Sequence, residues 1–79
     1  MISVYILESL NSRGYYIGMT KNLEKRLSEH NSGKVHSTKN RGSFKLVYTE
    51  EYDTYGKARE REIEIKAYKG GNSFKKLLT

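Results

Sequence analysis

The sequence predicts a small α/β domain in which helices flank one antiparallel sheet of about three strands, in the order ββαβαα. Segments rich in β-branched and aromatic residues alternate with segments rich in helix formers. The 79 residues allow one domain, spanning 1–79, with a thin core, because roughly 60% of the unfolded chain's surface is buried at this size. Cysteine is absent, so no disulfide or thiolate-bound metal stabilises the fold.

The first twenty residues predict a β-hairpin, because two strand-like segments flank a turn sequence. These are the strands 3–7 and 15–20 and the turn 11–14. If the hairpin is centred between Leu10 and Asn11, Tyr5 lies opposite Tyr16, and directly paired residues point to the same face. Such a pair is ordinarily aromatic packing between strands, so by itself it does not indicate a site.

A helix is predicted from about Asn22 to Asn31, because Thr20 or Asn22 can cap its first N–H groups. Its apolar stripe is narrow and consists of Leu23 and Leu27. We therefore expect this helix to lie on the sheet rather than to cross a core.

The second half of the chain predicts an exposed basic loop, a strand and two helices. Asp53 and Thr54 resemble a helix cap, Gly70 and Gly71 end the longer helix, and Ser73 caps the last one. The expected spans are 32–42 for the loop, 44–50 for the strand, and 55–68 and 74–78 for the helices.

The charge distribution indicates a polyanionic partner. Fifteen Lys and Arg residues against nine Asp and Glu give a formal charge of +6, and no acidic residue falls within 30–49 or 65–79. Such a surface suits nucleic acid. The alternative is that a small protein is basic only for solubility.

The composition also excludes several classes of protein. No stretch approaches the roughly 18 apolar residues of a membrane span, and the first residues do not open a signal peptide. Without cysteine, zinc ribbons and redox enzymes are excluded as well. We expect a soluble, cytoplasmic protein with no membrane partner.

One carboxylate occupies a helix position expected to be apolar. Glu62 is flanked around the helix axis by Ile63 and Ile65. A carboxylate at the rim of a basic site is a natural Mg²⁺ ligand. The alternative is an acid at the edge of the stripe, paired with Arg59 or Lys66. The face that it shares consists of Tyr55, Ala58, Glu62 and Ile65.

A second unusual pair occupies the first predicted helix. Arg26 and His30 lie one turn apart, on the flank that also carries Leu23 and Leu27. This arrangement puts a fixed cation beside an imidazole, and an Arg fork matches phosphate oxygens. The alternative is a solvent-facing surface shared with Glu29.

Taken together, these residues resemble the GIY-YIG nuclease domain. That family includes the N-terminal cleavage domain of a DNA-repair excinuclease, several homing endonucleases and small stand-alone bacterial proteins. The chain looks most like the stand-alone group, from about Ser3 to Leu78. The pieces that carry the resemblance are Val4-Tyr5, Tyr16-Ile17-Gly18, Arg26 with His30, and Ala58-x-x-x-Glu62.

Three positions depart from the family's pattern. The first motif usually begins with Gly, and here it begins with Ser3. Met19 stands where repair-type members often carry Lys, so one phosphate contact is missing. Asn72 corresponds to a late Asn of many members, although Gly70 and Gly71 disturb the spacing.

The resemblance implies a metal-dependent endonuclease that hydrolyses DNA phosphodiester bonds with a single Mg²⁺ or Mn²⁺ and little sequence preference. It would act in DNA repair or processing. Glu62 would anchor the metal, Arg26 would hold the phosphate oxygens, and Tyr16 would position the water or phosphate. Either Tyr5 or His30 would be the general base. A tyrosine base requires a pKa lowered from about 10 by the nearby cation and metal.

The resemblance also implies that duplex or branched DNA is the partner. Gly18 would leave room for a backbone or phosphate, although a β-bulge or a close helix–sheet contact explains it equally. Activity could be slow, or could require a larger protein that supplies specificity. The alternatives are a non-catalytic nucleic-acid-binding module with the same fold and a purely structural domain. The expected nucleic-acid contacts are Gly18, Lys34, Lys39, Arg41, Lys45 and Asn72.

Overall fold

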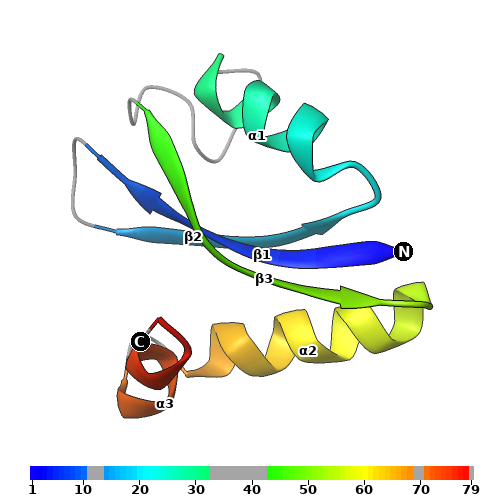
Figure 1. Ribbon diagram of the computed structural model, residues 1–79. Coiled ribbons are helices and arrows are strands. Elements are labelled where there is room, and N and C mark those ends of the chain that lie inside the picture. The colour runs from blue at the N-terminus through cyan, green and yellow to red at the C-terminus, as the bar shows by residue number, and fades with distance from the viewer. Residues whose placement is uncertain (11–13, 33–42, 69–70, 79) are drawn as a thin grey trace.

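The computed structural model describes residues 1–10, 14–32, 43–68 and 71–78 and confirms the predicted fold class. Three strands form one antiparallel sheet in the order β2-β1-β3, and Figure 1 shows α1 on one face and α2 and α3 on the other. The elements are β1 (Ile2–Ser9), β2 (Tyr15–Thr20), α1 (Leu23–Asn31), β3 (Phe44–Tyr52), α2 (Tyr55–Ala67) and α3 (Asn72–Leu77).

The central strand β1 is covered on both faces. Every residue from Ile2 to Leu7 is buried, although successive side chains of a strand point to opposite faces. Val4 and Ile6 face α2, whereas Tyr5 and Leu7 face α1. Because helices cover both sides of the strand, its residues are apolar or aromatic on both faces from Val4 to Leu7.

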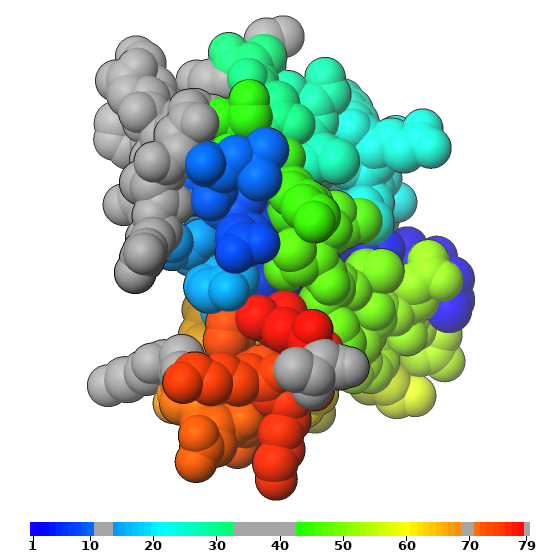
Figure 2. All heavy atoms as spheres, turned by 60° about the vertical axis from the view of Figure 1, so that its left-hand side comes forward, coloured from blue at the N-terminus to red at the C-terminus, as the bar shows by residue number. Residues whose placement is uncertain are grey.

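Two apolar clusters result from this three-layer arrangement. The larger lies between the sheet and the pair α2 and α3, and its buried members are Ile2, Val4, Ile6, Ala58, Ile65 and Phe74. In the smaller cluster, Leu23 and Leu27 of α1 pack against buried Tyr5, Leu7 and Phe44. The prediction that the first helix lies on the sheet is thus confirmed. Figure 2 shows the same layers in space-filling form, with α1 above the strands and α3 below.

The pairing of the hairpin differs from the prediction. Tyr5 lies opposite Gly18, not opposite Tyr16, and Tyr16 lies opposite Leu7. The predicted pairing was wrong by two residues along β2, because the composition of a turn does not determine how many residues it contains. A shift of two residues leaves every side chain on the same face, so Tyr5 and Tyr16 still point to the α1 side.

The helix starts follow from capping, with one exception. The side chain of Asn22 accepts a hydrogen bond from the Lys25 N–H at the start of α1, and Thr54 accepts one from the Lys57 N–H at the start of α2. The prediction that Ser73 caps the last helix was wrong. Gly71 occupies that position, and no side chain caps α3.

A polar cluster joins β3 to α2 beside the larger apolar cluster. Arg61 donates from Nε and Nη2 to the two carboxylate oxygens of Glu50, at 2.9 and 3.0 Å. The hydroxyls of Tyr48 and Tyr52 donate to the same carboxylate. Burial by itself would raise the pKa of Glu50, but the hydrogen bonds from Arg61 and the two tyrosines outweigh it and lower this pKa to about 2.

The described part of the chain contains no helix long and apolar enough to cross a membrane. The predicted basic loop lies outside the described residues apart from Ser32, which is exposed.

Candidate active site

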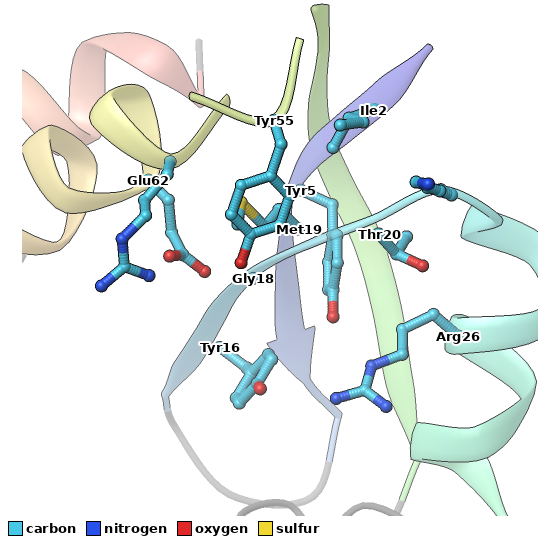
Figure 3. A pocket seen from close by; sticks show the side chains of 11 residues that line it. Ile2, Tyr5, Tyr16, Gly18, Met19, Thr20, Arg26, Tyr55 and Glu62 are labelled. Atoms are coloured by element: carbon cyan, nitrogen blue, oxygen red, sulfur yellow. The ribbon is translucent and has the colours of Figure 1, made fainter. Parts of the chain in front are cut away.

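An open pocket of about 300 Å³ lies over the outer strand β2. Gly18 and Met19 of β2 line it from the two faces of that strand, Arg26 lines it from α1, and Glu62 lines it from α2. Figure 3 shows Glu62 projecting from one side and Arg26 from the other, with the Tyr5 phenol between them. The pocket therefore joins side chains from the two helix layers that the sheet separates elsewhere.

The buried side of this pocket is an aromatic group built around Tyr5. Its phenolic oxygen lies 3.0 Å from Nε2 of His30, and both residues are 1% exposed. The ring of Tyr16 contacts the rings of both, with centroids 6.2 Å from Tyr5 and 4.5 Å from His30. Tyr5 and Tyr16 line the pocket, whereas His30 lies behind Tyr5 and does not.

Burial keeps both members of the Tyr5–His30 pair neutral at pH 7. It raises the pKa of the Tyr5 phenol, and interaction with Arg26 opposes this only in part. Burial also lowers the pKa of His30, and the nearby Arg26 charge lowers it further. A tyrosine base requires a lowered pKa, and the neighbouring cation was expected to help lower it. The protein's own residues instead leave the pKa of Tyr5 raised.

Gly18 is required by the position of Tyr5. A Cβ atom at residue 18 would lie 2.6 Å from the Tyr5 phenolic oxygen and 2.8 Å from its Cζ. Real Cβ atoms do not approach other atoms this closely, so the ring occupies the space that a side chain would need. Gly18 thus makes room for an aromatic ring of the same chain. It does not lie at the bulge in the sheet, which falls between Ile6 and Leu7.

Arg26 both pairs with Glu29 and lines the pocket. Its Nη1 lies 3.4 Å from Oε1 of Glu29, as the solvent-facing alternative required, yet its side chain also lines the pocket. Tyr5 raises the pKa of Arg26 further, so the guanidinium stays charged. A long ion pair whose side chains are about one third exposed contributes less than about 1 kcal/mol. The guanidinium can therefore exchange Glu29 for a phosphate at little cost.

Glu62 is the carboxylate of the pocket. Its side chain is 12% exposed, and Lys66 Nζ lies 3.7 Å from its Oε2, which is one of the two pairings expected from the sequence. Of the predicted face, Ala58 and Ile65 are buried, whereas Tyr55 is 57% exposed and that part of the prediction was wrong. Ile63, expected to flank Glu62, is 53% exposed. Ile63 therefore lies outside the contact between α2 and the sheet.

The donor set fits one hydrated divalent cation. Among the described residues, no three His, Cys, Asp or Glu side chains lie together as a closed metal site. A single carboxylate in an open pocket suits Mg²⁺, which keeps several waters and binds through one or two carboxylates together with substrate phosphates. Glu62 is the residue of the pocket that offers such a ligand.

The two other predicted nucleic-acid contacts that the structure describes do not line the pocket. Lys45 is exposed on β3 and Asn72 is exposed at the start of α3, and neither lines it. Lys34, Lys39 and Arg41 lie outside the described residues.

Sequence reasoning did not assign six residues of the pocket wall to the site, of which Lys21, Tyr55 and Arg59 carry a charge or an aromatic ring. The other three are Ile2, Met19 and Thr20. Tyr55 and Arg59 lie seven and three residues before Glu62, so helical periodicity from Glu62 could have identified both. Lys21 lies between β2 and α1 and has no such signal.

This arrangement defines a small three-layer α/β domain with a pocket whose charged residues are mostly cationic, which suits an anionic substrate. The chain belongs to the GIY-YIG family, since the model described as the GIY-YIG catalytic domain matches residues 1–75. Membership supports a nuclease-type function in general terms.

Relatives of similar size share most of the chain. A UPF0213 protein of Syntrophus aciditrophicus is 48% identical over 65 residues, which cover 80% of this chain and 74% of that protein. A UPF0213 protein of Clostridium perfringens is 44% identical over 64 residues, which cover 80% and 68%. The solution NMR structure of a UPF0213 protein from Bacillus halodurans is 36% identical, covers 85% of this chain and 72% of that one, and has a TM-score of 0.51. The resemblance to the small stand-alone group is thus confirmed.

Proposed function

We propose that the chain is an endonuclease that hydrolyses DNA phosphodiester bonds with one divalent cation, Mg²⁺ or Mn²⁺, in DNA repair or processing. The observation that carries this proposal is that Tyr5, Tyr16, Arg26 and Glu62 line one pocket, with His30 directly behind Tyr5. The formal charge of +6 supports a polyanionic substrate.

In this proposal, Arg26 binds the non-bridging oxygens of the scissile phosphate. The guanidinium presents several donors in a fixed fork, which matches two phosphate oxygens at once. Negative charge increases on these oxygens as water attacks phosphorus, so the same contact is stronger in the transition state than in the bound substrate. Tyr16, which lines the pocket beside Tyr5, orients the water or the phosphate.

Tyr5 is the group that faces the attacking water, since it lines the pocket and His30 does not. Neutral His30 with its proton on Nδ1 presents a lone pair on Nε2, which can accept the phenolic proton at the observed 3.0 Å. The water oxygen then bonds to phosphorus as its proton passes to the Tyr5 oxygen. The bond from phosphorus to the leaving 3′ oxygen breaks, and that oxygen takes a proton from solvent. His30 then returns the proton it accepted to solvent, which restores the neutral pair.

Glu62 would hold the divalent cation. When bound, the cation supplies Lewis-acid stabilisation of the phosphate and of the leaving oxygen. Lys66 Nζ, 3.7 Å from the carboxylate, balances part of its negative charge until a cation binds. Little sequence preference is expected, because contacts to phosphate carry no sequence information. A larger protein that supplies specificity is part of the same proposal.

The test is the nicking of supercoiled plasmid and branched DNA with and without Mg²⁺ or Mn²⁺. Cleavage should require the metal and should be lost in Glu62→Gln and Arg26→Ala. Glu60→Gln is the matched control, because Glu60 is an exposed acid on the same helix outside the pocket. Metal-independent cleavage, or full activity of Glu62→Gln, would contradict the proposal. Salt-dependent DNA binding without cleavage, unchanged in Glu62→Gln, would indicate the non-catalytic binding module instead.

A further inference from the structure

Tyr55 differs from the six other tyrosines of the chain. Each of the six has a hydrogen bond or a ring contact: Tyr5 with His30, Tyr15 with Phe74, Tyr16 with Tyr5, Tyr48 and Tyr52 with Glu50, and Tyr68 with Arg61. Within the described residues, no hydrogen bond or ring contact holds Tyr55. It is also 57% exposed, so it contributes little to the apolar core.

The position of Tyr55 connects it to the pocket. It is the first residue of α2 and lies two helical turns before Glu62, so both side chains leave the helix on the same side. Figure 3 shows its ring standing over the pocket beside Tyr5, with Glu62 next to it. An exposed aromatic ring by itself needs no explanation. Here, however, the ring forms part of the wall of the proposed catalytic pocket.

The charges around the same pocket match a nucleic-acid backbone. Lys21, Arg26 and Arg59 line it, whereas Glu62 is its one acidic lining residue among those described. A cationic groove beside an exposed aromatic ring is the combination by which proteins bind single strands without sequence preference, because every base offers a face for stacking. A base inside an intact duplex is already stacked on both faces and cannot offer one.

We propose that Tyr55 is a stacking platform for an unpaired base next to the scissile phosphate. The substrate class is therefore a strand with an unpaired base at the cleavage site, as in single-stranded, flapped or gapped nucleic acid. In this arrangement Arg26 binds the phosphate, and Arg59 and Lys21 bind the neighbouring phosphates. The inference rests on the proposed function, since it places the base relative to the phosphate at Arg26.

The test measures binding in a background that does not cleave. Glu62→Gln is combined with Tyr55→Ala, with Tyr55→Phe or with Ile63→Ala. Ile63 is an equally exposed apolar residue on the same helix that does not line the pocket. Dissociation constants are measured for a single-stranded oligonucleotide and for the matching duplex. Stacking on the protein is followed by the fluorescence quenching of a single 2-aminopurine in the strand.

The parent should bind the single strand more tightly than the duplex and should quench the probe. Tyr55→Ala should weaken single-strand binding about tenfold and abolish the quenching, within the range measured for base–aromatic stacking. Tyr55→Phe should stay within twofold of the parent, because stacking needs the ring and not the hydroxyl. Ile63→Ala should bind as the parent does.

Equal binding by Tyr55→Ala and the parent would overturn the inference. A loss of binding in Tyr55→Phe as large as in Tyr55→Ala would also overturn it, because the hydroxyl and not the ring would then be responsible. Cleavage assays on the otherwise natural chain separate this from the proposed function. Metal-dependent cleavage that Tyr55→Ala leaves unchanged on all substrates would overturn the platform and leave the nuclease standing. Tyr55-dependent stacking in a chain that never cleaves would overturn the nuclease and leave the platform standing.

Discussion

The phenolic oxygen of Tyr5 lies 3.0 Å from Nε2 of His30, and this contact joins β1 to α1 inside the smaller apolar cluster. Both side chains are buried, and the same phenol lies directly over Gly18. The Tyr5 phenol, which we propose to face the attacking water, is thus hydrogen-bonded to the His30 imidazole. It also lies against Gly18, which has no side chain. Changes in any of the three should affect reactivity and stability together.

Tyr5→Phe should remove activity while keeping the fold. The ring remains and fills the same volume, so the free energy of unfolding should fall by only about 1 kcal/mol for the lost hydrogen bond. The cleavage rate should fall by about 10²- to 10⁴-fold, the usual contribution of a general base. Single-turnover cleavage and urea unfolding measure the two effects. Tyr68→Phe, which loses a phenol outside the pocket, should cleave at the natural rate; a similar rate for Tyr5→Phe would contradict the role of Tyr5.

His30 should make the protein less stable in weak acid. Its pKa is lowered in the folded chain from the ordinary 6.5, so below pH 6.5 the unfolded chain takes up a proton that the native chain does not. The free energy of unfolding should therefore decline as the pH falls from 6.5 toward the lower native pKa, and level off beneath it. Denaturant unfolding at pH 7.5, 6.5 and 5.5 measures this decline. In His30→Gln it should be smaller, and an unchanged pH dependence would show that His30 does not cause it.

Gly18→Ala should displace the phenol of Tyr5. The added methyl group would lie 2.6 Å from the phenolic oxygen, and the ring cannot move far because it is buried. We expect a loss of about 1–3 kcal/mol in the free energy of unfolding, typical of overpacking, together with reduced cleavage. Gly56→Ala is the matched control, because nothing lies within 4 Å of its added methyl group and the residue is in α2. That variant should be neutral or slightly more stable. Equal effects at both positions would refute the steric explanation.

The cluster around Glu50 should stabilise the fold against acid. The pKa of this carboxyl is about 2 in the folded chain against an ordinary 4.5, so its contribution is complete above pH 4.5 and is lost as the pH falls toward 2. The difference corresponds to about 3 kcal/mol. This window begins at pH 4.5, below the pH 6.5 at which the loss from His30 begins.

Arg61→Gln should remove most of this acid-sensitive stability. It takes away two hydrogen bonds to a largely buried carboxylate, so we expect a loss of about 3 kcal/mol at pH 7 and a smaller change between pH 4.5 and 2. Lys57→Gln breaks the largely exposed pair with Asp53 and should cost less than about 0.5 kcal/mol. Equal losses in the two variants would show that the Glu50 cluster stabilises the fold no more than an exposed ion pair does.

Much of the fold could be predicted from local patterns. Runs of β-branched and aromatic residues predicted the strands, and Asn22 and Thr54 predicted the helix starts, because strand preference and capping depend on neighbours in the sequence. The pairing of Tyr5 with Tyr16 was wrong, because register depends on the length and shape of the turn. The prediction that the two phenols share a face was nevertheless correct, because side-chain direction repeats every two residues.

By itself, the sequence determined the class of fold, the basic character and the set of unusual polar residues, since each is a property of composition or of short-range periodicity. Only the tertiary structure decided that Arg26 from one layer and Glu62 from the opposite layer line one pocket over β2, because their meeting depends on the strand order and on which faces the helices cover. The exposed ring of Tyr55 beside them was decided at the same level. No local pattern distinguishes a tyrosine that packs from one that faces an open pocket.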